Sequence, residues 1–251
     1  MQKQYVKVII IIATVGLLSG CNNKNNTNEY SNNSIENLDG TSLTFRGLTY
    51  NIIQAGGHQW LDRNLGSSSA CSDYRGDSEC WGDLYQWGRP SDGHQKRNSS
   101  TVSEISSNVQ PNHNNFILVH IKEKDIVKAA PHIVTANWYT LHDNSLWQEN
   151  AIGVCPTGWR VPTIHDFEDL NISSPKDAFH KIKLSLSGFR VGHDMNNNGK
   201  VRGASYMGFY WTSTIKHDKN AVAAFKIDIG VEPTYHYHAK ASGNSVRCMK
   251  D

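Results

Sequence analysis

The fold is decided by the stretch Cys155-Pro156-Thr157-Gly158-Trp159-Arg160-Val161-Pro162-Thr163. Its proline and glycine predict a turn, and the alternation of Trp159 and Val161 around Arg160 predicts a short, half-buried strand. Pro162 ends that strand because proline cannot donate a hydrogen bond to a neighbouring strand. Thr163 is then expected to cap the N-terminus of a helix.

A short helix is expected directly after this strand, over residues 164–170. Asp166 and Glu168 lie near its positive end, where acidic side chains are favourable. Phe167 and Leu170 give the helix one apolar face. The cysteine, the turn, the strand and the helix start therefore lie close together in sequence, and Cys155 can fasten them to another part of the chain.

The beginning of the chain has the pattern of an export signal. Lys3 and Lys7 supply a basic start, and residues 8–18 form an apolar run that is too short for an ordinary membrane span. The run leads into Leu18-Ser19-Gly20-Cys21, which resembles a bacterial lipobox. We therefore expect Cys21 to be lipidated and to attach the protein to a membrane. A plain signal peptide or a short anchor is the alternative.

Three segments are expected along the chain. Residues 1–20 form the signal peptide. Residues 21–39, rich in Asn and Ser with few apolar side chains, form a flexible polar tether. Residues 40–251 contain all seven tryptophans of the chain. That length and that aromatic content suffice to bury one core, so we expect a single domain.

The charge balance argues against nucleic acid as a partner. Without Lys3 and Lys7, the remaining chain carries 23 basic and 23 acidic residues. A general nucleic-acid-binding protein needs a basic field to attract phosphate groups. We therefore expect no nucleic-acid partner.

Four cysteines remain besides Cys21, and an even number in an exported chain predicts disulfides. Three pairings are possible. We favour Cys71–Cys80, which closes a local loop, together with Cys155–Cys248, which closes a loop of 94 residues. In the chain-entropy description, a loop of that length contributes about 4–5 kcal/mol.

Sequence patterns predict many short strands and few helices in the domain. Strands are expected at 43–45, 48–53, 58–61, 159–161, 184–191, 206–214, 221–229, 234–238 and 245–249. Helices are expected at 81–89, where Trp81, Leu84 and Trp87 recur at helical spacing, and at 175–182. Residues 116–130 are read as a strand followed by a short helix.

Several longer words of the sequence occur together, in order, between Leu43 and the C-terminus. They are Trp60-Leu61-Asp62-Arg63-Asn64-Leu65, Tyr85-Gln86-Trp87-Gly88-Arg89 with Asp92-Gly93-His94-Gln95, the stretch from Cys155 to Thr163, Leu186-Ser187-Gly188-Phe189-Arg190, Tyr210-Trp211-Thr212-Ser213-Thr214 and Ser245-Val246-Arg247-Cys248. This set resembles the Fibrobacter succinogenes major paralogous domain (FISUMP), a family found on secreted and lipid-anchored bacterial proteins. Its tryptophans, Trp60, Trp87, Trp159 and Trp211, are expected in the core.

The resemblance implies an α+β fold of the C-type-lectin-like kind, with small twisted antiparallel sheets, two or more helices and long loops. It also implies that the ends of the domain meet, with strands 43–53 beside 245–249. The family has no established activity to carry over. The expected function is that of a lipid-anchored cell-envelope protein, on the outer membrane, whose domain binds a protein or a glycan. The alternatives are an enzyme on a formylglycine-generating-like scaffold and a structural envelope component.

One loop has the beginning of a calcium-binding pattern. Asp194, Asn196 and Asn198 supply oxygen atoms at alternate positions before Gly199. Ser205, however, stands at the twelfth position, where a calcium loop requires a bidentate glutamate. A metal-free turn rich in Asn and Gly is therefore favoured. We expect no cofactor, with calcium as the alternative.

Candidate ligand-binding residues come from the second half of the chain. His236 and His238 share one face of a strand, but zinc would require a further ligand, so a solvated or aromatic-packed face is favoured. The resemblance implies that partners contact the loops and strands of this half. The polar or aromatic side chains there that could give directional contacts are Tyr206, His236, Tyr237, His238 and Asn244, with the two tyrosines as anchors, and a solvated rim is the alternative. We assign no catalytic residue, because the sequence has neither Gly-x-Ser-x-Gly nor His-Glu-x-x-His.

Overall fold

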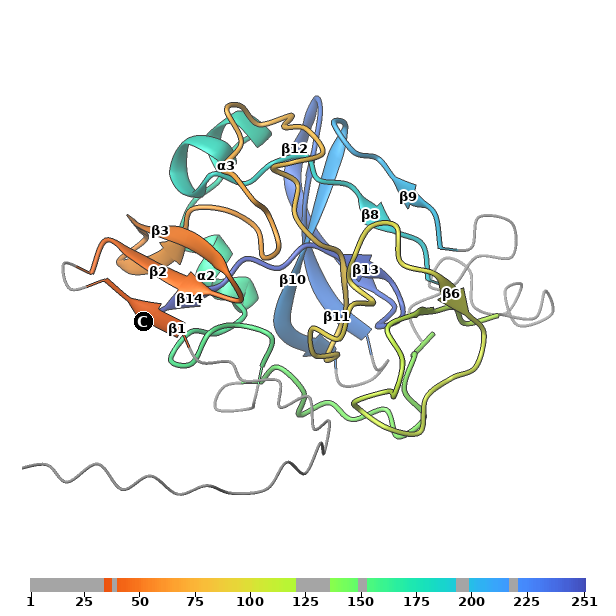
Figure 1. Cartoon of the computed structure of the whole chain (residues 1–251). Coiled ribbons are helices and arrows are strands. Elements are labelled where there is room, and N and C mark those ends of the chain that lie inside the picture. Colours follow the sequence, from red (N-terminus) through yellow and green to blue (C-terminus); the bar gives the residue numbers. More distant parts are fainter. Residues whose placement is uncertain (1–33, 38–39, 121–135, 149–152, 193–198, 217–220) are drawn as a thin grey trace, which may run out of the picture.

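The computed structural model of the chain describes residues 34–37, 40–120, 136–148, 153–192, 199–216 and 221–251 (Figure 1). These residues form mainly short antiparallel strands, together with the helices α2 (Ile164–Glu168) and α3 (Pro175–Ile182). In these ranges, no helix has both the length and the apolar character that a membrane crossing requires. The expected sheet-rich α+β class is therefore confirmed.

One five-stranded sheet contains both the first and the last strand of the described domain. Its strands, in spatial order, are β1 (Ser34–Glu36), β2 (Ser42–Phe45), β3 (Leu48–Ala55), β4 (His58–Leu61) and β14 (Met249–Lys250). The first half of β3 pairs with β2 and its second half pairs with β4. Glu36 and Lys250 then approach to 3.1 Å as an ion pair. The ends of the domain therefore meet, and β4 lies between β3 and the C-terminal strand.

The other strands form three further sheets. A three-stranded antiparallel sheet contains β10 (Met207–Lys216), β11 (Ala221–Asp228) and β12 (Val231–His238). A four-stranded sheet of two-residue strands has the order β5 (Tyr85–Gln86), β13 (Gly243–Asn244), β8 (Phe189–Arg190) and β9 (Val201–Arg202). A parallel pair joins β6 (Thr101–Val102) to β7 (Phe116–Ile117). Long loops connect these small sheets.

The turn between β2 and β3 follows from its two residues. Arg46 and Gly47 both have positive φ, at 50° and 77°. Two such residues in succession give a turn whose twist matches that of the flanking antiparallel strands. The expected hairpin is confirmed, and it places Arg46 at the tip beside the buried ring of Phe45.

The expected cap at Thr163 is present, and α3 has a cap of its own. Thr163 accepts a hydrogen bond from the backbone N–H of Asp166, whose carboxylate accepts one from the backbone of Thr163. Arg160 donates to the same carboxylate at 2.7 and 3.0 Å. In α3, Ser174 is the N-cap and Pro175 occupies the first turn. Both caps satisfy backbone N–H groups that a helix leaves without partners.

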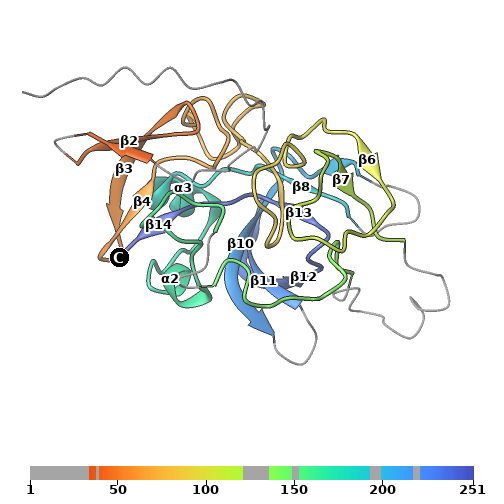
Figure 2. The ribbon, with the colours of Figure 1, turned by 60° about the horizontal axis from the view of Figure 1, so that its bottom comes forward.

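Both helices pack between the five-stranded sheet and the three-stranded sheet (Figure 2). Phe167 of α2 stacks on Phe225 of β11 with ring centroids 4.7 Å apart, and it also contacts Trp60 of β4. Trp60, Trp87 and Trp211 are completely buried. The predicted core positions of the family words are therefore confirmed for these tryptophans, and Trp159 is also buried.

Both favoured disulfides are formed. Cys71 and Cys80 close a local loop with a Cα–Cα distance of 5.0 Å. Cys155 and Cys248 lie 5.8 Å apart at their Cα atoms and join positions 93 residues apart in sequence. The second bond fastens the segment before α2 to the end of the chain.

The helix expected at residues 81–89 is wrong. Gly82 has a φ of 72°, outside the right-handed helical region. The backbone N–H groups of Asp83 and Leu84 donate to the carbonyls of Leu65 and Gln95 instead of forming helical bonds. Residues 85–86 join the ladder of β13 as the strand β5. Long-range backbone pairing therefore overrides the helical spacing of the apolar residues.

Several predicted strands are shorter than expected. The strand at 159–161 is reduced to one bridge between Arg160 and Met249. In 184–191 only β8 remains, because the N–H groups of Ser185 and Leu186 bond to Tyr210 and Tyr74. The strand at 245–249 begins only at Met249. The strand at 116–130 is limited to β7, and the helix expected after it falls largely outside the described residues.

Loss of the long-range disulfide is expected to cost more stability than loss of the local one. The double variant Cys155→Ser/Cys248→Ser should lose about 2 kcal/mol more than Cys71→Ser/Cys80→Ser, because the longer loop restricts the unfolded chain more strongly. Urea unfolding of both variants checks this. Replacing both cysteines of each pair avoids an unpaired thiol. Equal losses would show that loop length does not set the contribution.

Candidate functional site

The two tyrosines expected to anchor a ligand lie at opposite ends of the three-stranded sheet. Tyr206 precedes β10, and its carbonyl accepts from the N–H of Ile229 at the turn that leads into β12. Tyr237 pairs with Ala223 near the other end of the sheet. Both are exposed, at 65% and 40%. The structure therefore presents them to solvent but does not bring them together.

The histidines and the asparagine of that prediction belong to a packed surface. His236 and His238 share a face, as expected, and contact Phe209, with a centroid distance of 4.3 Å for His238. Burial and the charge of Lys226 lower the pKa of His236. Asn244 was expected to project outward, which is wrong. It is fully buried in β13, and its amide lies 3.1 Å from Nδ1 of His238.

The candidate calcium ligands Asp194, Asn196 and Asn198 lie outside the described residues, as does the expected lipidation site Cys21. Among the residues that the structure does describe, no group of three or more His, Cys, Asp or Glu side chains could hold a metal ion.

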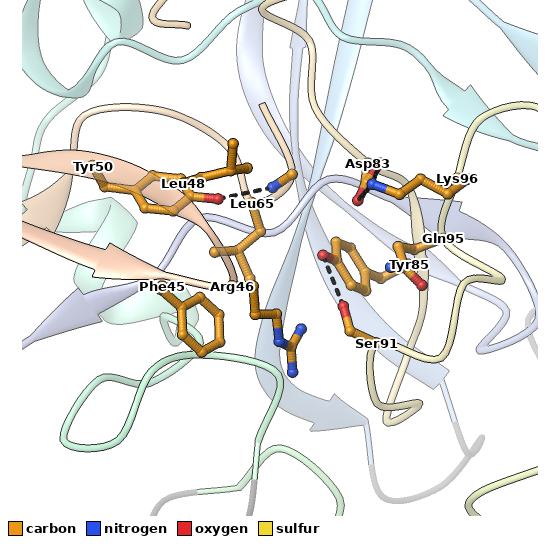
Figure 3. A pocket seen from close by; sticks show the side chains of 11 residues that line it. Phe45, Arg46, Leu48, Tyr50, Leu65, Asp83, Tyr85, Ser91, Gln95 and Lys96 are labelled. Atoms are coloured by element: carbon orange, nitrogen blue, oxygen red, sulfur yellow. Dashed lines mark hydrogen bonds and ion pairs between the residues drawn. The ribbon is translucent and has the colours of Figure 1, made fainter. Parts of the chain in front are cut away.

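A pocket lies between the β2–β3 hairpin and the loop that surrounds β5 (Figure 3). Its volume is about 170 Å³. Its lining combines buried rings and apolar side chains with charged side chains, namely Phe45, Arg46, Leu48, Tyr50, Leu65, Gly66, Asp83, Tyr85, Ser91, Gln95 and Lys96. The pocket brings together aromatic, acidic and basic side chains from segments that are far apart in the sequence. We take it as the candidate site.

Two tyrosines form facing walls of the pocket. Tyr50 comes from β3 and Tyr85 from β5, and Figure 3 shows their hydroxyl groups pointing toward each other. The hydroxyl oxygen of Tyr50 accepts from the N–H of Gly66 at 3.0 Å, and that of Tyr85 accepts from the hydroxyl of Ser91 at 3.2 Å. Burial raises the pKa of both phenols. Both rings therefore remain neutral hydrogen-bonding groups at physiological pH.

A buried carboxylate completes the pocket. Asp83 is held at 2.8 and 3.2 Å by the ammonium of Lys96, which is itself half exposed. Burial raises the pKa of Asp83, and Lys96 opposes that rise. A methyl group at Gly66 would lie 2.1 Å from a carboxylate oxygen of Asp83. Because Gly66 has no side chain, the carboxylate of Asp83 can occupy this space.

A buried network holds the loop that supplies Ser91, Gln95 and Lys96. Asp92 accepts from Nε of Arg89 at 2.7 Å, and its other oxygen lies 2.6 Å from Nδ1 of His94. The N–H of Gln86 donates to Nε2 of His94. Nε2 therefore carries no proton, and Nδ1–H donates to the carboxylate. Burial lowers the pKa of His94 to about 4.

The pocket could not be predicted from the sequence, although some of its residues stand out there. Tyr85 and Gln95 belong to words that resemble the family, but the apolar spacing of residues 81–89 predicts a helix. The lining also comes from three separate segments, around residues 45–50, 65–66 and 83–96. The pair Gly82-Asp83 offered one signal, because both residue types favour a turn over the interior of a helix.

The buried His94 predicts a specific dependence of stability on pH. The unfolded chain binds a proton on this ring below about pH 6.5, whereas the folded chain excludes it down to about pH 4. Through His94, stability should therefore rise as pH increases across that window. Urea midpoints at pH 5 and pH 7 should differ more for the wild type than for His94→Gln.

An NMR titration of the His94 ring provides the direct check on the folded wild-type protein. The ring signals should stay unchanged until the pH approaches about 4. A His94 ring that titrates near pH 6.5 would contradict the buried, neutral state.

Comparisons of the chain with models of known protein families, with curated proteins and with solved structures found no match. The family resemblance of the sequence words therefore stays a prediction. The candidate site stands on the geometry and charges of the pocket between the β2–β3 hairpin and the loop around β5.

Proposed function

We propose that the protein is a lipid-anchored component of the bacterial cell envelope, carrying one C-type-lectin-like domain that binds a protein or glycan ligand. The lipobox-like word at residues 18–21 supports the anchor. The two disulfides are typical of an exported domain. Small antiparallel sheets, long loops and meeting ends support the fold.

The observation that carries the binding function is the pocket itself. Tyr50 and Tyr85 are almost completely buried and belong to the hydrophobic core, and both also line this pocket. Asp83 is buried there too and places a carboxylate, paired with Lys96, in the wall of the pocket. Rigid aromatic walls with a few polar groups are the usual composition of a ligand site.

One observation favours an enzyme as the second candidate. Asp83 is a buried acid with a raised pKa in a pocket, and such groups are frequent at catalytic sites. Two contacts favour binding instead. The carboxylate of Asp83 is already paired with Lys96. The hydroxyl of Ser91 is bonded to Tyr85, a neutral phenol that cannot act as a general base for it.

The described cysteines also argue against thiol chemistry. Cys71, Cys80, Cys155 and Cys248 all form disulfides. None of these four therefore supplies the thiolate that a nucleophilic or metal-binding cysteine requires. Non-catalytic binding is the function that the pocket supports best.

Lipidation of Cys21 predicts a clear effect of one substitution. In a bacterial host fed with labelled palmitate, the full chain should incorporate the label and partition with membranes. Cys21→Ser should do neither, because the thiol that receives the lipid is missing. Cys71→Ser, which removes a cysteine of the folded domain, should keep the label. A cleaved product without label that still partitions with membranes would overturn the anchor.

Binding predicts that the full chain, purified in detergent, captures a ligand from a set of glycans and envelope proteins. Tyr85→Phe should weaken that ligand by about two- to tenfold, the usual worth of one neutral hydrogen bond. The matched controls Tyr206→Phe and Tyr237→Phe remove exposed hydroxyls elsewhere and should bind normally.

The same measurements separate the alternatives. A ligand that is weakened by the controls and not by Tyr85→Phe would move the site to the three-stranded sheet. Conversion of a captured ligand, detected by mass spectrometry, would favour the enzyme. If no glycan or envelope protein binds the folded wild-type chain, the binding function is wrong.

A further inference from the structure

The two disulfides lie in different surroundings. Cys155 and Cys248 are 3% and 0% exposed and belong to the largest hydrophobic cluster of the domain. Cys71 is partly exposed, and the loop that contains it, residues 68–79, consists mainly of exposed polar residues. A reductant in solution therefore reaches the local bond at Cys71 without any opening of the core, whereas the long-range bond is shielded.

The local bond also has a stabilised leaving group. Cys80 is only 3% exposed, so attack from solvent takes place at Sγ of Cys71. The bond that breaks leaves its electron pair on Sγ of Cys80, which accepts a hydrogen bond from the backbone N–H of Asp77 at 3.2 Å. A hydrogen bond to the charged form of a group favours that form, and a thiol with a lower pKa leaves faster.

The loop that this bond closes connects two segments that line the pocket. Gly66 lies just before the loop and Asp83 just after it. The hydroxyl of Ser67 donates to the carbonyl of Cys80 at 3.0 Å, and the N–H of Asp83 donates to the carbonyl of Leu65 at 2.9 Å. These hydrogen bonds and the disulfide together hold the two ends of the loop against each other. Loss of the cross-link therefore loosens the segment that carries the carboxylate of Asp83.

We propose that the Cys71–Cys80 disulfide is a site of thiol–disulfide exchange with a dithiol reductant, and that its reduction loosens the pocket while the domain stays folded. Cys155–Cys248 stays oxidised and keeps the fold. In the oxidised protein the disulfide itself is the reacting group, so no free thiolate of the chain is needed. The proposal concerns the redox state of the chain and does not depend on which ligand the pocket binds.

The exchange takes place in two balanced steps. A thiolate of the dithiol attacks Sγ of Cys71 and forms a mixed disulfide, while the bond to Cys80 breaks and the Cys80 thiolate takes up a proton from water. The second thiolate of the dithiol then attacks the dithiol sulfur of the mixed disulfide, closes an internal disulfide and releases Cys71, which is protonated in turn. The protein gains two electrons and two protons, and the dithiol loses both.

Graded reduction of the full chain in detergent tests the exchange. The protein is equilibrated with mixtures of reduced and oxidised dithiothreitol, quenched with an alkylating agent and mapped by mass spectrometry. The local bond should be half reduced at a ratio of reduced to oxidised reagent at least about tenfold lower than the long-range bond requires, because exposed disulfides are more easily reduced than buried structural ones. Reduction of both bonds at one ratio, or of Cys155–Cys248 first, would overturn the proposal.

Amide hydrogen exchange tests the effect on the pocket. With only the local bond reduced, the N–H of Asp83 should exchange at least about tenfold faster, because its segment opens locally. The amides of β11, in the middle of the three-stranded sheet, should keep their protection. Unchanged exchange at Asp83 would show that the bond does not act on the pocket. Loss of protection throughout β11 would show that the bond is needed for the fold itself. Either result contradicts the proposal.

The variant Cys71→Ser/Cys80→Ser is the matched control. It lacks the local bond in every redox state, so its Asp83 amide should exchange as fast as in the reduced wild type, and dithiothreitol should cause no further change. A response of this variant to dithiothreitol would assign the effect to Cys155–Cys248 and refute the proposal. Because the readout is an amide of the chain, no ligand is needed, and a failure of the proposed binding function would leave this result unaffected.

Discussion

The guanidinium of Arg247 is the contact on which the rest of the domain depends. It is 1% exposed and donates to the carbonyls of Leu61, Ile182 and Lys183 and to the side chain of Asn64. These partners belong to the end of β4, the C-terminus of α3 and the chain that leaves the sheet. Burial lowers its pKa to about 10, so it stays charged at neutral pH. One side chain therefore joins three parts of the molecule, next to the disulfide of Cys248.

The same contact leads to the pocket. Asn64 accepts from Arg247 at 2.7 Å, and its own amide donates to the carbonyl of Trp81 at 3.0 Å. The next residue, Leu65, accepts from the N–H of Asp83. The segment that carries Gly66 and the segment that carries Asp83 are thereby held against each other. The position of the buried carboxylate is thus set from Arg247 through a short series of hydrogen bonds.

Local features of the fold could be read from the sequence because neighbouring residues decide them. The cap at Thr163, the turn at Arg46-Gly47 and the helix at 175–182 each depend on a few adjacent side chains. The failures occur where distant backbone decides. The apolar residues of 81–89 recur at helical spacing, yet the backbone of this segment forms hydrogen bonds with β13 and Leu65 instead. The strand at 245–249 is interrupted because the carbonyls of Val246 and Cys248 accept hydrogen bonds from the N–H groups of Leu65 and Leu61.

The candidate site could not be predicted from the sequence either, because it depends on contacts between distant segments. Tyr50, Gly66 and Asp83 have no common pattern in the sequence, and their segments are brought together by long-range contacts such as those around Arg247 and Asn64. The exposed Tyr206 and Tyr237, by contrast, could be named from residue type alone. They lie far apart on the sheet, however, and do not form a cavity together. The pocket gathers a buried acid, two neutral phenols and cations from separate segments, and this convergence makes it the candidate site. Lys96 makes the burial of Asp83 tolerable, because the ion pair offsets the cost of desolvating the carboxylate.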